Sequence, residues 1–120
     1  MIQKIELGPS EAARLAVKVA TEKRANDIVL LDMRGVCTFT DYFVVLTAES
    51  QRQMQALIED LDTALDLGGV SLHHREGGND GGWVLMDYGA FIVHAFGPEE
   101  RAFYQLEHLW AHAPVLLRIQ

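Results

Sequence analysis

Two short apolar segments place the strongest constraint on how this chain can fold. They occupy residues 28–31 (IVLL) and 42–46 (YFVVL), and neither alternates apolar and polar residues as a strand with one solvated face would. A strand that is apolar on both faces needs cover on both faces. The two segments therefore predict central strands of a sheet that carries other elements on each side.

Three further segments show apolar residues at helical spacing. Ser10 is a candidate cap for the first helix, and Ser50 with Gln53 has the spacing of a capping box at the start of the second. Pro98 suits the first turn of the third helix. The spacing predicts that the apolar side of this last helix consists of Phe103, Leu106, Leu109 and Trp110.

The remaining segments complete a mixed sheet. Residues 71–76 are polar enough for an edge strand, and residues 83–87 and 91–96 predict a hairpin around 88–90, after a glycine-rich turn at 77–82. The resulting order is αββαβββα, in which the helix between the second and third strands predicts a parallel crossover. We expect an α/β (α+β) fold with a five-stranded mixed sheet and flanking helices, in one domain spanning residues 1–120.

The charge of the chain limits its partners. There are 17 acidic and 10 basic residues, and the net charge is −7. Because nucleic-acid affinity comes largely from Lys and Arg, we expect little direct contact with nucleic acid. The charge is compatible with steering toward a basic partner and also with a role in solubility alone. The short apolar runs, the absence of a recognisable secretory signal and the single cysteine indicate a cytoplasmic protein without a membrane partner.

Residue patterns for catalysis and metal binding are weak. His108 and His112 have helical spacing, but Pro114 follows closely and no third ligand is near, so we predict no metal site. Nucleotidyl transfer needs two carboxylates on one strand face and a glycine-rich phosphate turn. The one Asp-x-Asp pair, Asp60 and Asp62, lies inside a predicted helix, where residues two apart do not face each other. We therefore predict no catalytic group and no cofactor.

Partner binding is the remaining class of function. Residues alternate along a strand, so Trp83, Leu85 and Asp87 share one face of the sheet, beside Ile92, His94 and Phe96 of the neighbouring strand. Tryptophan is enriched at interface hot spots, which makes Trp83 a candidate anchor. Burial in the core explains the pattern equally well, and Tyr104 has the same ambiguity.

The sequence resembles the ribosomal silencing factor family, also called the Iojap family. The resemblance covers residues 8–116 and is carried by "DIVLLDMRG", "FTDYFVVLTAESQRQMQAL" and "GGWVLMDYGAFIVHAFGPEERAFYQLEHLW". It implies a nucleotidyltransferase-like fold without the catalytic signature. It also implies a homodimer when free and binding to the large ribosomal subunit at a small basic ribosomal protein, number fourteen of that subunit. Bound there, such a factor blocks subunit joining and represses translation, notably in stationary phase or starvation.

The resemblance also implies which residues bind the partner. Trp83 would be the apolar anchor with Leu85 beside it, and Asp87 would supply charge toward Lys or Arg. His94, Arg101 and Tyr104 match further positions of the family motif. Two alternatives stay open: a nucleotidyltransferase-like enzyme with a degenerate metal site, and a homodimeric scaffold that acts away from ribosomes.

Overall fold

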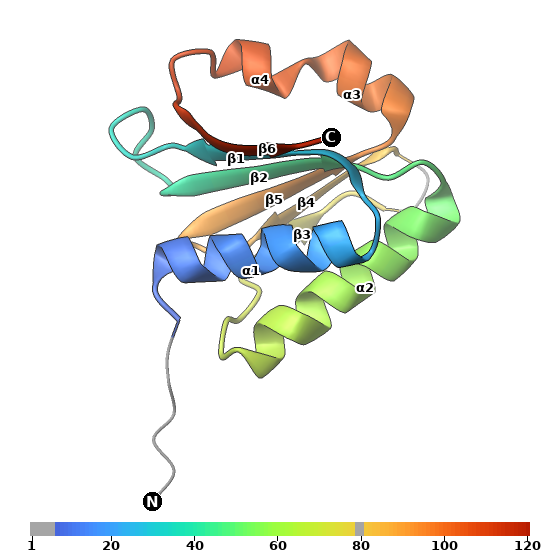
Figure 1. The fold of residues 1–120 in the computed structure, drawn as a ribbon, viewed down its shortest axis with the longest axis horizontal. Coiled ribbons are helices and arrows are strands. Elements are labelled where there is room, and N and C mark those ends of the chain that lie inside the picture. The colour runs from blue at the N-terminus through green and yellow to red at the C-terminus, as the bar shows by residue number, and fades with distance from the viewer. Residues whose placement is uncertain (1–6, 79–80) are drawn as a thin grey trace, which may run out of the picture.

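One mixed sheet lies between two layers of helices in the computed structural model, which describes residues 7–78 and 81–120 (Figure 1). Helices α1 (Pro9–Glu22) and α2 (Gln51–Leu67) cover one face, and the shorter α3 (Pro98–Tyr104) and α4 (Leu106–Leu109) cover the other. The centre of the glycine-rich turn predicted for residues 77–82 lies outside the described residues.

The sheet contains six strands in the order β3-β4-β5-β2-β1-β6. Strands β2 and β5 pair in parallel, and the other neighbouring pairs are antiparallel. It follows that β2 and β3 run in the same direction, as predicted for a crossover through α2, with two strands between them. The strands are β1 (Asn26–Asp32), β2 (Tyr42–Thr47), β3 (His74–Glu76), β4 (Trp83–Asp87), β5 (Phe91–Phe96) and β6 (Val115–Ile119).

The two apolar segments form the central strands that their composition predicts. Alternate residues of β1 point to opposite faces: Ile28 and Leu30 pack in the core under α1 and α2, whereas Val29 and Leu31 pack in the core under α4. All six residues of β2 are buried. A polar side chain on either face of these strands would lose its hydration without gaining a solvent contact, which explains why the segments are apolar throughout.

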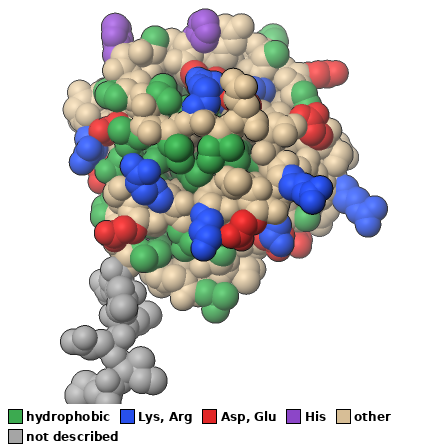
Figure 2. Space-filling model, in the orientation of Figure 1, with side chains coloured by type: hydrophobic (Ala, Val, Ile, Leu, Met, Phe, Trp, Pro, Cys, Tyr) green, Lys and Arg blue, Asp and Glu red, His purple; other side chains and the backbone are tan. Residues whose placement is uncertain are grey.

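The prediction of five strands is wrong because β6 follows Pro114. The Asp32 amide donates to the Pro114 carbonyl at 2.9 Å, and β6 then pairs antiparallel with β1 at the edge of the sheet. Val115 and Leu116 are exposed there. Figure 2 shows hydrophobic side chains gathered across the middle of this face, in the band between α1 and the α3–α4 layer where β6 runs.

Two predicted helix caps have different outcomes. The backbone N–H of Gln53 donates to the Ser50 hydroxyl at 3.1 Å, as predicted. The Gln53 side-chain oxygen, however, accepts from the backbone N–H of Glu49 rather than from that of Ser50. The first helix is capped by Gly8, and Ser10 lies within the helix. Pro9 explains this shift, since proline suits the first helical turn and moves the cap to the residue before it.

The predicted last helix is broken at Gln105, which has a left-handed backbone conformation (φ 46°, ψ 52°). The break changes the helical phase, so the predicted apolar stripe does not form. Leu106 is buried, but Phe103 and Leu109 are 80% and 72% exposed. The outer side of this helical layer therefore presents large apolar groups to solvent.

Candidate docking surface

Trp83 begins β4 on the sheet face that α3 and α4 cover. Its side chain is half-buried, and its ring lies 4.9 Å from the Phe96 ring and 4.7 Å from the Tyr104 ring, measured between centroids. Leu85 lies on the same face, opposite His94 in the register of β4 and β5. The predicted alternation along β4 is confirmed, and Trp83 is both a core residue on one side and a surface residue on the other.

His94 lies beneath Trp83 and is only 4% exposed. The indole N–H of Trp83 donates to His94 Nδ1 at 3.3 Å, and His94 Nε2 has no hydrogen-bond partner among the described residues. Burial lowers the pKa of His94 to about 4, so the imidazole is neutral at physiological pH. Because the side chain is buried, it can act on this surface only through Trp83, and the predicted contact of His94 with a partner stays a prediction.

Arg101 is also buried, and its guanidinium holds α3 against the sheet. It donates to the Glu107 carboxylate at 3.0 Å and to the Thr47 hydroxyl at 2.8 Å, and it forms an ion pair with Asp27 at 3.3 Å. These groups come from α4, β2 and β1. Arg101 thus braces the helical layer, and its predicted partner-binding role stays a prediction.

Asp87 ends β4 and is half-buried. Its Oδ1 accepts from the Gly89 amide at 2.7 Å and so stabilises the turn between β4 and β5, where Gly89 has φ +84°. A turn of this kind favours glycine because a side chain is disfavoured at positive φ. Asp87 therefore has a structural role, and the predicted charge contact with a partner stays a prediction.

Two hollows border the exposed aromatic residues. One, of about 210 Å³, is lined by Glu76, Gly77, Trp83 and Leu85, and the other, of about 350 Å³, is lined by Gly81, Glu99, Glu100, Phe103 and Tyr104. Tyr104 is 47% exposed. Apolar rings with carboxylates at their edge suit a partner with basic groups around an apolar centre. We define the Trp83 surface as Trp83, Leu85, Phe103, Tyr104, Glu76, Glu99 and Glu100.

The sequence pattern did not identify four members of the Trp83 surface. Glu99 and Glu100 fit the positive first turn of a helix, and Glu76 fits a polar edge strand, so none of them required a binding role. Phe103 fitted an apolar stripe. The signal for its exposure is the break at Gln105, and glutamine is not a residue type that marks a left-handed conformation.

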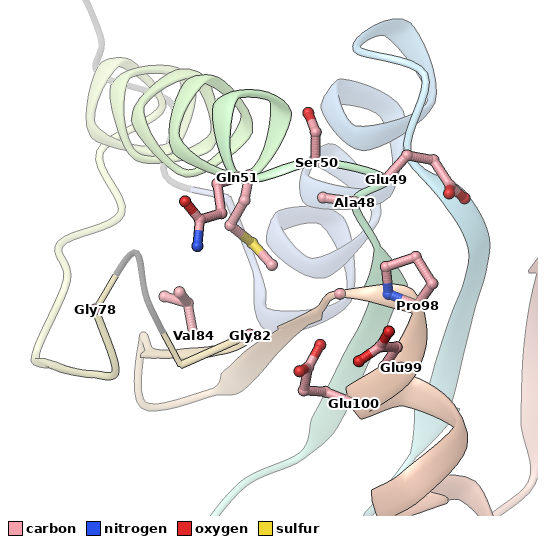
Figure 3. A pocket seen from close by; sticks show the side chains of 12 residues that line it. Ala48, Glu49, Ser50, Gln51, Gly78, Gly82, Val84, Pro98, Glu99 and Glu100 are labelled. Atoms are coloured by element: carbon pink, nitrogen blue, oxygen red, sulfur yellow. The ribbon is translucent and has the colours of Figure 1, made fainter.

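A further cavity of about 350 Å³ lies between the starts of α2 and α3 and shares Glu99 and Glu100 with the Trp83 surface. Figure 3 shows Gln51 reaching toward it from α2, and Glu99 and Glu100 reaching toward it from α3. The charged side chains among its described lining residues are Glu49, Glu99 and Glu100. Three carboxylates repel a phosphate group, so this cavity does not favour the nucleotidyltransferase alternative.

The residues described by the structure contain no group of three or more His, Cys, Asp or Glu side chains that could hold a metal ion. His108 lies in α4, whereas His112 lies beyond the end of that helix, so the two do not share a helix face. No helix in the described part of the chain is long and apolar enough to cross a membrane.

Comparison with known proteins assigns the chain to a family. Residues 7–119 match the family model described as "Ribosomal silencing factor during starvation". A ribosomal silencing factor of Bacillus subtilis is 37% identical over 85% of this chain and 86% of its own length. A mouse protein named mitochondrial assembly of ribosomal large subunit protein 1 is 28% identical over 80% of this chain and 43% of its own.

A solved structure supports the same assignment. The crystal structure of protein CV0518 from Chromobacterium violaceum superposes with a TM-score of 0.83, with 31% identity and coverage of 88% of both chains. Since the family model matches nearly the whole sequence and the relatives share both sequence and fold, this chain belongs to the ribosomal silencing factor family.

Proposed function

We propose that this protein represses translation by binding the large ribosomal subunit through the Trp83 surface and sterically blocking subunit joining. Family membership supports a silencing role, and the name of the mouse relative points to the large subunit. The observation that carries the choice of surface is the half-buried indole of Trp83, which is supported from below by buried side chains and lies beside exposed Tyr104. Rigid aromatic residues of this kind are typical interface hot spots.

The partner in this proposal is a small basic ribosomal protein, number fourteen of the large subunit. Glu76, Glu99 and Glu100 place carboxylates around the apolar rings, and the whole chain has a net charge of −7. Opposite charge on the partner would steer the encounter and raise the association rate. The same carboxylates disfavour docking on the phosphate backbone of ribosomal RNA.

The mode of action in this proposal is steric, so the protein acts as a regulator and not as an enzyme. Binding needs shape and charge complementarity at the Trp83 surface, and no bond is made or broken. We further propose that the protein works in the cytoplasm and forms a homodimer when free. The exposed side chains of Phe103 and Leu109 support self-association, because exposed apolar groups on a helical layer gain free energy when a second surface covers them.

Binding to isolated ribosomal protein number fourteen tests the choice of surface. Trp83→Ala should weaken the affinity by more than about 1 kcal/mol, as measured by calorimetry, because it removes the apolar anchor. Leu67→Ala is the matched control, since Leu67 is 83% exposed at the end of α2, in the opposite helical layer, and should leave the affinity unchanged. Equal affinities for both folded variants would place the docking surface elsewhere.

A further inference from the structure

The two ring nitrogens of His94 have different surroundings. Nδ1 accepts the indole N–H of Trp83 at 3.3 Å, and Nε2 is buried without a partner among the described residues. An indole nitrogen donates only, so Nδ1 must be unprotonated, and a neutral imidazole then carries its proton on Nε2. The contact with Trp83 therefore fixes both the charge state and the tautomer of His94.

This arrangement is unfavourable for a residue that only fills space. A buried N–H without a partner destabilises the folded state, and an apolar side chain of similar size would avoid that cost. The neighbours of His94 on the same face of β5 are Ile92 and Phe96, which are apolar. The feature that distinguishes His94 from these neighbours is its lone pair on Nδ1, and that lone pair points at Trp83.

The imidazole itself is held in a fixed orientation. The Phe43 ring contacts it edge to face with centroids 4.6 Å apart, and the Phe96 ring is stacked at 6.4 Å. Rotation of the imidazole by half a turn would replace Nδ1 with a C–H group opposite the indole N–H. A rigidly held acceptor therefore selects one orientation of the Trp83 ring.

We propose that His94 is a positioning residue that orients the indole of Trp83 for docking without touching the partner. In this orientation the Trp83 ring contacts the Tyr104 ring and lines the same hollow as Leu85. The exposed part of the indole then belongs to the Trp83 surface. An anchor held in its bound orientation loses less conformational entropy on binding. The consequence for affinity rests on the proposed function, whereas the orientation of the indole does not.

Nuclear magnetic resonance of the free protein tests the orientation. The imidazole ¹⁵N shifts of the wild type should show the Nε2–H tautomer, and the Trp83 indole N–H signal, assigned with Trp83→Phe, should have the shift of a hydrogen-bonded group. His94→Leu should move this signal, whereas His94→Asn, which keeps an acceptor near the position of Nδ1, should largely retain it. The Trp110 indole signal is the internal control. An Nδ1–H tautomer, or an indole shift unaffected by His94→Leu, would overturn the proposal.

A double-mutant cycle tests the consequence for docking. His94→Leu should weaken binding to ribosomal protein number fourteen about fivefold, as the loss of one hydrogen bond to the anchor implies, and His94→Asn should restore most of it. In a Trp83→Phe background His94→Leu should have no further effect, because phenylalanine has no N–H to orient. An equal loss in both backgrounds would show that His94 acts through packing alone. If Trp83→Ala leaves the affinity unchanged, the docking surface is wrong, while the resonance data still decide the role of His94.

Discussion

At the scale of single residues, one side of the Trp83 indole packs in the core and the other side is exposed. Phe96 and His94 pack against the ring from the sheet, and Tyr104 contacts it at the surface. The same residue can therefore stabilise the fold and bind a partner. This dual role explains why alternation along the strand placed Trp83 on the right face but left open whether it was core or anchor.

His94 should make the stability of the protein depend on pH. Its folded pKa of about 4 lies below the ordinary value of 6.5, so the unfolded chain binds the proton more tightly. The free energy of unfolding should therefore fall as the pH drops from about 6.5 to 4, by about 3 kcal/mol. Urea denaturation across this range measures it. The same measurement on His94→Leu gives the pH dependence that comes from the carboxylates, which is then subtracted from that of the wild type. Identical pH profiles for both proteins would contradict the low pKa of His94.

Substitution of Asp87 tests whether its negative charge contributes to partner binding as well as to the turn between β4 and β5. Asp87→Asn keeps an oxygen that can accept from the Gly89 amide, so the free energy of unfolding should change by less than about 0.5 kcal/mol. If the charge also faces the basic partner, the variant should associate more slowly, and the difference should shrink as salt screens the interaction. Stopped-flow association at low and high salt measures this. A rate equal to that of the wild type at low salt would restrict Asp87 to its structural role.

At the scale of elements, Arg101 links the α3–α4 layer to the sheet. Arg101→Met should lower the free energy of unfolding by about 2 kcal/mol, because it removes the hydrogen bonds of the buried guanidinium to Thr47 and Glu107, whereas Asp27 keeps its ion pair with Arg118. Arg34→Met is the control: Arg34 forms an exposed ion pair with Asp32, so solvent screens the interaction and its loss should leave the free energy of unfolding nearly unchanged. Chemical denaturation compares the two variants. Equal losses would mean that Arg101 does not brace the layer.

Local sequence signals predicted the elements that they define by themselves. The segments at 28–31 and 42–46 formed central strands because both of their faces are apolar, and Ser50 began α2 because its side chain caps the helix. Strand β6 was missed because its existence depends on pairing with β1, which is far away in sequence. The short apolar segment after Pro114 contains no local sequence signal that predicts this pairing.

The candidate site was predictable in part for the same reason. Alternation along β4 and β5 placed Trp83, Leu85 and His94 on one face, and the structure confirms that placement. The burial of His94 and Arg101 results from the α3–α4 layer that covers this face. The shape of the α3–α4 layer depends on the left-handed conformation of Gln105, and a glutamine at that position does not predict this conformation.

At the scale of the whole molecule, the two sheet faces have different cover. The long helices α1 and α2 bury one face under a large apolar core, whereas α3 and α4 are short and leave the aromatic end of β4 half-exposed. The carboxylates of Glu76, Glu99 and Glu100 lie around that opening. Among the described residues, half-exposed apolar rings bordered by carboxylates are suited to a partner that carries basic groups.

Co-sedimentation with separated ribosomal subunits tests the central claim most directly. The wild type and Leu67→Ala should pellet with large subunits and not with small ones, and a smaller fraction of Trp83→Ala should pellet with large subunits. When small subunits are then added, large subunits incubated with the wild type should form fewer joined ribosomes than large subunits incubated with Trp83→Ala. Failure of the wild type to pellet with large subunits, or unreduced pelleting of a folded Trp83→Ala variant, would contradict docking through the Trp83 surface.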